Sequence, residues 1–67
     1  MTIKEANEAA RQLLPIIYND MEFERITQVG IGYNGKGEPH YFLQILGKNH
    51  GSVVYVDPSR CNVKPSD

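Results

Sequence analysis

Residues 53–63 read Val-Val-Tyr-Val-Asp-Pro-Ser-Arg-Cys-Asn-Val, which is the pattern of a strand, a tight Pro-Ser turn and a second short strand. The same alternation of apolar β-formers with polar residues begins at Glu22 and is interrupted by clusters of Gly, Asn and Pro. Short alternating runs bounded by such clusters are typical of antiparallel strands joined by hairpins. The sequence therefore predicts a small, strongly curved antiparallel β-meander over residues 16–63.

The segment before the meander has the pattern of one amphipathic helix. Thr2 is a suitable N-cap, and Glu5 three residues later completes a capping box. Apolar side chains recur at helical spacing from Ile3 onward, and Pro15 ends the run because the residue before a proline is disfavoured in the α conformation. We therefore expect a single α+β domain, residues 1–67, with a helix over 1–14, the meander over 16–63 and a polar tail over 64–67.

Three local features predict how the meander bends. Asn19-Asp20 favours a tight hairpin, because both residues tolerate a positive φ. Ile26 is out of phase with the odd-numbered apolar residues on either side of it, which predicts a bulge near residues 25–28. Gly30 and Gly32 lie on one face of their strand, and the missing side chains predict a sharp bend or the close approach of the helix or another chain.

The ending Val56–Val63 resembles the last strand, 3₁₀ turn and strand of SH3 domains, with Pro58, Ser59 and Val63 in matching places. The resemblance implies that the meander forms a small SH3-like barrel. The chain has no Trp and no Ala-Leu-Tyr-Asp-Tyr opening. We therefore do not carry over the binding of proline-rich peptides.

The whole chain also resembles small proteins of Gram-positive phages and mobile elements. The shared features are a short helix, the turn at residues 18–23 (Tyr-Asn-Asp-Met-Glu-Phe), the run Gly-Ser-Val-Val at residues 51–54, and the late Asp57-Pro58. Some proteins of this kind inhibit host defence by blocking a nuclease or by sequestering a signalling nucleotide. The resemblance implies that function class and supplies no residue roles.

Composition limits the partners and the compartment. The formal charge is −1, from seven basic and eight acidic residues, whereas a general nucleic-acid binder collects Lys and Arg, so we expect nucleic-acid binding to be weak or absent. The sequence shows no signal peptide and no apolar run long enough for a membrane span, and its one cysteine fits a reducing compartment. We expect a cytoplasmic protein.

The small core predicts a homo-oligomer. A chain of 67 residues buries a limited share of its surface, and one cysteine with two histidines supplies neither an intrachain disulfide nor a structural zinc site. The strand Tyr41–Leu46 is apolar on both faces, and the sheet edges carry little protection. A second copy of the chain would bury this surface.

No residue pattern predicts catalysis, a metal or a cofactor. His40 and His50 flank one strand and cannot meet, and Cys61 has the pattern of a buried apolar residue. The Gly-x-Gly-x-x-Gly at residues 30–35 leads into a turn, whereas a dinucleotide site needs a helix there. Glu22 and Glu24 fit a solvated strand face. We therefore expect that the protein is not an enzyme.

Binding is the remaining function class. Tyrosine and arginine dominate the energetics of interfaces, and the candidate binding residues are Tyr33, Tyr41, Tyr55, Arg25 and Arg60. We expect a non-enzymatic protein-interaction module, acting as a phage or mobile-element inhibitor of a host defence protein. Two alternatives stay open: an oligomeric sponge for an anionic, nucleotide-like small molecule, and a nucleic-acid-binding SH3-like barrel.

Overall fold

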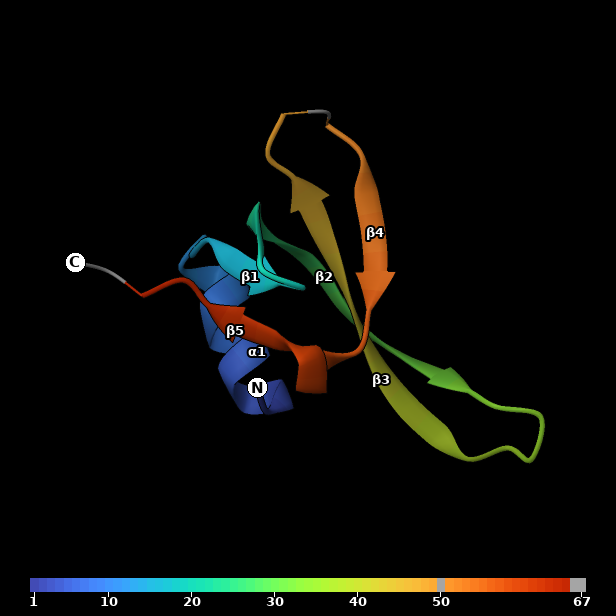
Figure 1. Cartoon of the computed structure of the whole chain (residues 1–67). Coiled ribbons are helices and arrows are strands. Elements are labelled where there is room, and N and C mark those ends of the chain that lie inside the picture. The colour runs from blue at the N-terminus through green and yellow to red at the C-terminus, as the bar shows by residue number, and fades with distance from the viewer. Residues whose placement is uncertain (50, 66–67) are drawn as a thin grey trace.

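A computed structural model describes residues 1–49 and 51–65, and these form one helix and a five-stranded antiparallel sheet (Figure 1). This confirms the predicted α+β class. His50 and the last two residues of the predicted polar tail lie outside the described residues. The elements are α1 (Ile3–Arg11), β1 (Ile16–Tyr18), β2 (Met21–Tyr33), β3 (Pro39–Gly47), β4 (Val53–Val56), the 3₁₀ helix η1 (Pro58–Arg60) and β5 (Cys61–Val63).

Helix α1 begins with the predicted capping box. The Thr2 hydroxyl accepts from the Glu5 N–H at 3.1 Å, and the Glu5 carboxylate accepts from the Thr2 N–H at 2.9 Å. The helix ends at Arg11 rather than at residue 14, because Leu13 adopts a positive φ of 58° that turns the chain before Pro15. Its buried residues, Ala6 and Ala9, are small, so the helix can lie close to the sheet.

The hairpin between β1 and β2 turns at Asn19 and Asp20, whose φ angles are 53° and 61°. Positive φ at both central residues is the type I′ geometry that suits the right-handed twist of paired strands, and the predicted tight turn is confirmed. The pairing of β2 with β3 shifts register between Phe23 and Arg25 and again between Ile26 and Gln28. These irregularities confirm the predicted bulge, and they bring Ile26 onto the buried face.

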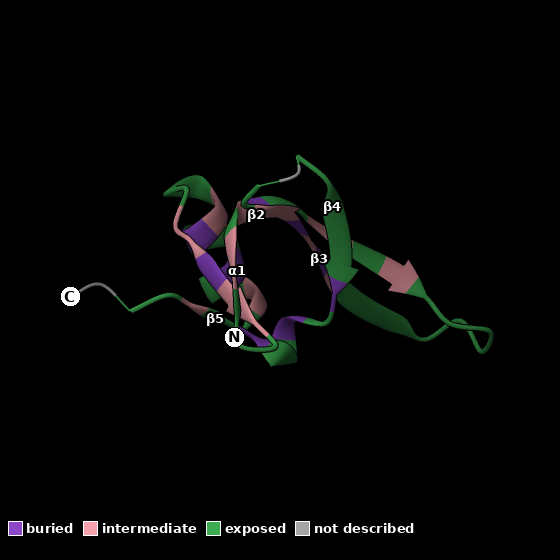
Figure 2. Cartoon of the chain, turned by 45° about the horizontal axis from the view of Figure 1, so that its top comes forward, coloured by how far each residue is buried: buried purple, intermediate pink, exposed green. Residues whose placement is uncertain are grey.

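The strand order is β4-β3-β2-β1-β5, with β5 returning after η1 to pair with β1. The sheet curls strongly around its core (Figure 2), but within the described ranges β4 and β5 are unjoined edges, so the sheet is not a closed barrel. The core consists of Ala6, Ala9, Ile16, Ile26, Leu43, Ile45, Val56 and Cys61. The N-terminal ammonium group donates to the carbonyl oxygens of Pro58 and Cys61 at 2.9 and 3.2 Å, which ties the start of α1 to the last turn.

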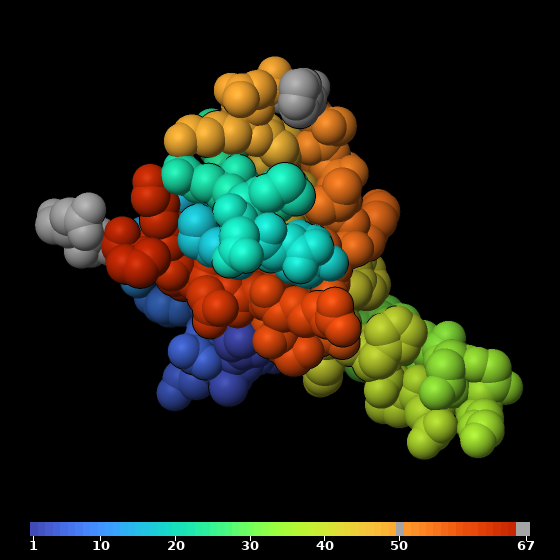
Figure 3. Space-filling view, in the orientation of Figure 1, coloured from blue at the N-terminus to red at the C-terminus, as the bar shows by residue number. Residues whose placement is uncertain are grey.

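The end of β2 and the start of β3 extend beyond this core as a hairpin, here called the arm (residues 30–41). It is the projection at the lower right of Figures 1 and 3, and it contributes to the elongated extents of 42 × 24 × 20 Å. The apolar strand Tyr41–Leu46 is therefore only partly buried. Leu43 and Ile45 are buried, but Tyr41, on the arm, is exposed.

Candidate functional site

Over most of the arm, the two strands pair only with each other and with no third strand of the described residues. β1 pairs with β2 only from Met21 to Phe23, and β4 pairs with β3 only from Leu43 to Leu46. Residues 30–41 thus present an open edge on each strand. An exposed hairpin with two open edges is a common template for contacts with other chains.

Asn34 orders the tip of the arm. Its side-chain oxygen accepts from the N–H groups of Lys36 and Glu38 at 2.8 and 3.0 Å, and its amide nitrogen donates to the Glu38 carboxylate at 3.1 Å. The Asn34 backbone also donates to the Glu38 carbonyl at 3.1 Å and accepts from the Gly37 N–H at 2.9 Å. One side chain therefore satisfies the donors of the turn and fixes its geometry.

One face of the arm carries three large exposed side chains. The register places Ile31 opposite Tyr41 and Tyr33 opposite Pro39, so all four lie on the same side of the sheet. Ile31 is 45% exposed, Tyr33 68% and Tyr41 49%. This surface, here called the tyrosine face (Ile31, Tyr33, Tyr41), continues the core face of the sheet past the point where other elements cover it.

The opposite face of the arm explains the two glycines. Gly30 lies opposite Phe42, and a Cβ added at Gly30 would come within 2.3 Å of the Phe42 ring. Gly32 lies opposite His40, whose ring would be 3.1 Å from an added Cβ. The predicted close approach is real, but it is made by rings of the neighbouring strand instead of by the helix or another chain.

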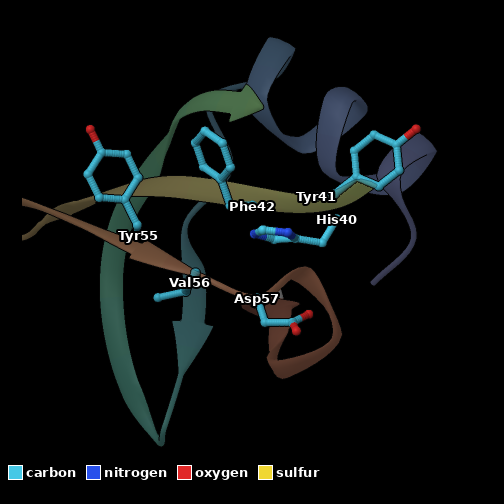
Figure 4. A pocket seen from close by; sticks show the side chains of 6 residues that line it. All are labelled: His40, Tyr41, Phe42, Tyr55, Val56 and Asp57. Atoms are coloured by element: carbon cyan, nitrogen blue, oxygen red, sulfur yellow. The ribbon is translucent and has the colours of Figure 1, made fainter. Parts of the chain in front are cut away.

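Phe42 also contacts Tyr55 of β4, with ring centroids 5.5 Å apart and planes at 71°. Edge-to-face packing of this kind orients both rings. Around them is an open depression of about 250 Å³, in which His40 lies near Phe42 and Asp57 (Figure 4). Hydrogen bonds from Ser59 hold the pKa of Asp57 below its ordinary value, so this carboxylate is ionised at neutral pH.

The structure separates the five residues that the sequence singled out. Tyr33 and Tyr41 share the tyrosine face, whereas the register Gln44↔Tyr55 places Tyr55 on the opposite side of the sheet, so the three tyrosines do not share a face. Arg25 lies opposite Leu46, on the same side as Tyr55, and Arg60 is an exposed residue of η1. Sequence analysis missed Ile31 and Phe42. The signal for Phe42 was the pair of glycines, since a glycine in a strand often accommodates a ring from its neighbour.

Other polar groups have structural explanations. The Glu22 carboxylate forms ion pairs with the ammonium groups of Lys48, at 2.6 Å, and Lys64, at 2.7 Å. It thus connects β2 to the turn after β3 and to the segment after β5, and it is not the freely solvated side chain expected from the sequence. The hydrogen bond from Lys48, and to a smaller extent the one from Lys64, lowers the pKa of Glu22. Cys61 is buried as predicted, and burial raises the pKa of its thiol, which disfavours the reactive thiolate.

Comparisons of the chain with protein-family models, with curated proteins and with solved structures found no match. No helix in the described part of the chain is long and apolar enough to cross a membrane. Among the same residues, no group of three or more His, Cys, Asp or Glu side chains is arranged to hold a metal ion. The arm is therefore the candidate site on the strength of its geometry and side chains.

Proposed function

We propose that this chain is a non-enzymatic protein-interaction module that binds its partner through the tyrosine face of the arm. The observation that carries the proposal is the exposure of Ile31, Tyr33 and Tyr41 side by side on a projecting, ordered hairpin. Tyrosine supplies a large contact area together with a polar tip, and it is enriched among the residues that dominate binding energy. Asn34 reduces the entropy lost on binding, because the tip is already ordered.

A protein partner suits this surface better than a small ligand. The three side chains project from an exposed two-stranded hairpin, whereas small-molecule sites are concave and bury most of their ligand. A partner with a groove can instead receive the whole arm. The partner expected from the phage resemblance, a host defence protein, remains the proposed partner class.

The strand order supports an SH3-like arrangement that is open between β4 and β5. After β4, the chain makes the 3₁₀ turn Pro58–Arg60 and returns as β5 to pair with β1. Asp57 caps this turn by accepting from the Ser59 N–H at 2.9 Å. These features agree with the resemblance of residues 56–63 to the end of SH3 domains, and we infer an open SH3-like sheet on that basis.

The proposal is tested by affinity capture from the cells in which the chain acts, followed by calorimetry with the purified partner. The double variant Tyr33→Ala, Tyr41→Ala should weaken that partner's binding at least about 30-fold, which corresponds to about 2 kcal/mol. Tyr55→Ala is the matched control, because Tyr55 is similarly exposed but lies on the opposite face. Loss of binding in Tyr55→Ala with full binding in the double variant would overturn the assignment of the surface.

Binding assays with purified protein also test the two alternative functions, the nucleotide sponge and the nucleic-acid-binding barrel. Tight binding of a nucleotide by the purified wild type, abolished by Arg25→Ala, would favour the sponge. Nanomolar binding of a nucleic acid at physiological salt would favour the nucleic-acid-binding barrel, against the expectation from the −1 charge.

A further inference from the structure

We propose that two copies of this chain pair antiparallel through the outer edge of β2 in the arm, around a two-fold axis at Ile31. The inference builds on the proposed function, since it concerns the same arm, but it uses the edge of the hairpin instead of its tyrosine face. Ile31 would lie opposite Ile31 of the second copy, and Val29 opposite Tyr33.

The hydrogen-bonding alternation of the arm shows which backbone groups are free to pair. Asn34 donates its backbone N–H to the carbonyl of Glu38 and accepts from the Gly37 N–H, so the backbone groups of Asn34 point toward the opposite strand at the end of the ladder. Bonded and non-bonded pairs alternate in an antiparallel ladder. The next pair, Tyr33 and Pro39, is therefore non-bonded, as is Ile31 with Tyr41, and the N–H and C=O groups of Ile31 and Tyr33 point away from β3.

The two edges of the arm differ in their capacity to pair. On the β3 edge, Pro39 has no N–H group to donate, which is a common way to blunt an edge strand. The β2 edge has no such protection, because residues 26–35 read Ile-Thr-Gln-Val-Gly-Ile-Gly-Tyr-Asn-Gly and contain neither a charge nor a proline. An uncharged, unprotected edge of this length is a site for strand addition.

A second copy is the occupant that this edge fits best. Pairing around Ile31 places no charged residue opposite another between residues 28 and 34, and the net charge of −1 gives little repulsion between two copies. It also aligns the outward-pointing donors and acceptors of each strand with those of the other. Because paired residues share a side of the sheet, the two tyrosine faces become one continuous surface.

The exposed area of the chain is compatible with such a dimer. The surface measures 4790 Å², whereas a compact monomer of 7.6 kDa has about 4,300 Å². The excess of about 500 Å² reflects the elongated shape of the chain. A contact along one strand edge of the arm is smaller than the roughly 800 Å² that each partner contributes to a standard interface. We therefore expect a dimer of moderate affinity that dissociates on dilution.

The first experiment compares Ile31→Lys with Tyr41→Lys by light scattering over a concentration series. Both positions are about half exposed on the same face, but only Ile31 lies on the pairing edge. Wild type and Tyr41→Lys should approach twice 7.6 kDa at high concentration, and Ile31→Lys should stay monomeric because two lysines would face each other. Circular dichroism checks that each variant is folded. A wild type that stays monomeric at every concentration overturns the proposal.

The second experiment tests the register with a short bis-maleimide that joins thiols. In Ile31→Cys, the two introduced residues would have Cα atoms about 5.5 Å apart, as in a bonded antiparallel pair. In Tyr41→Cys, the copies would be separated by three strand spacings, about 14 Å, beyond the span of the reagent. The wild type is the blank, since its thiol, Cys61, is buried.

Cross-linking of Ile31→Cys alone supports edge pairing. Cross-linking of Tyr41→Cys with equal yield would mean that the copies pack face to face, and it would overturn the edge proposal. This failure is distinct from failure of the proposed function. If the chain is monomeric, the Tyr33→Ala, Tyr41→Ala variant can still lose partner binding. If the chain is dimeric, partner binding can still be unchanged in that variant.

Discussion

The Phe42 ring lies over the backbone of Gly30, so that a single added methyl group at Gly30 would come within 2.3 Å of the ring. This contact joins β2 and β3 at the base of the arm. It also fixes the direction of the Phe42 ring, which then packs edge to face on Tyr55.

We predict that Gly30→Ala destabilises the fold by about 1–3 kcal/mol, the usual cost of forcing an extra carbon into a packed contact. The ring would have to leave Gly30 and would lose its present packing on Tyr55. Urea denaturation measures the change. Gly35→Ala is the matched control, because a Cβ at Gly35 has no neighbour within 4 Å. Equal stability of the two variants would show that the Phe42 ring moves freely.

Glu22 gives the fold a pH-dependent contribution. Lys48 and Lys64 lower its pKa in the folded chain below the ordinary value of 4.5. A carboxyl with a lowered pKa contributes stability that is present above the unfolded pKa and is lost as the pH falls through the folded pKa. We predict that the melting temperature of Glu22→Gln is lower than that of wild type at pH 7, that the difference shrinks as the pH falls below the ordinary pKa of 4.5, and that it vanishes once Glu22 is protonated in the folded chain.

Salt supplies the control for this prediction. The three side chains are partly exposed, so added salt should reduce the difference at pH 7 by screening the charges. Glu24→Gln removes a neighbouring exposed carboxylate from the same strand and should show a smaller effect. A difference between Glu22→Gln and wild type that persists unchanged in acid would contradict the ion-pair explanation.

The Cys61 thiol should react very slowly in the folded protein. Burial raises the pKa of its thiol, and its sulfur lies 3.6 Å from the Asp57 carbonyl oxygen. We predict that a disulfide reagent at neutral pH reacts with Cys61 only at the rate of unfolding, and rapidly in denaturant. The absorbance of the released thiol measures both rates. Fast reaction of the native protein would mean that the segment around β5 opens locally.

Local patterns in the sequence predicted local structure well. The Asn19-Asp20 turn and the Thr2 capping box depend on residues within a few positions of each other, and both are present. The bulge near Ile26 was visible as a break in a two-residue period. The end of the helix was misplaced because Leu13, a residue that rarely takes a positive φ, does so here.

Contacts between residues far apart in the sequence could not be predicted from local sequence patterns. The side of the sheet on which Tyr55 lies depends on the register between β3 and β4, which no local pattern near Tyr55 specifies. The projection of the arm depends on where β1 and β4 stop pairing, and no local pattern marks those points. Glu22 meets Lys48 and Lys64 only after the sheet has curled.

The ordering of the arm tip by Asn34 leads to the last prediction. Removing its side chain in Asn34→Ala leaves the N–H groups of Lys36 and Glu38 without their acceptor. The tip would then sample more conformations, and binding through the arm would have to order it again at an entropic cost. We expect faster hydrogen exchange at these two amides, with little change in the stability of the core because the tip lies at the end of the projecting arm (Figure 1).

Partner affinity should fall about 3- to 10-fold in Asn34→Ala, mainly through faster dissociation. Lys36→Ala is the control, since it alters a side chain of the same turn and keeps the Asn34 acceptor in place. Hydrogen exchange followed by mass spectrometry reports the order of the tip, and calorimetry reports the affinity. Faster exchange without any loss of affinity would show that the partner contacts the body of the sheet and that the arm does not guide binding.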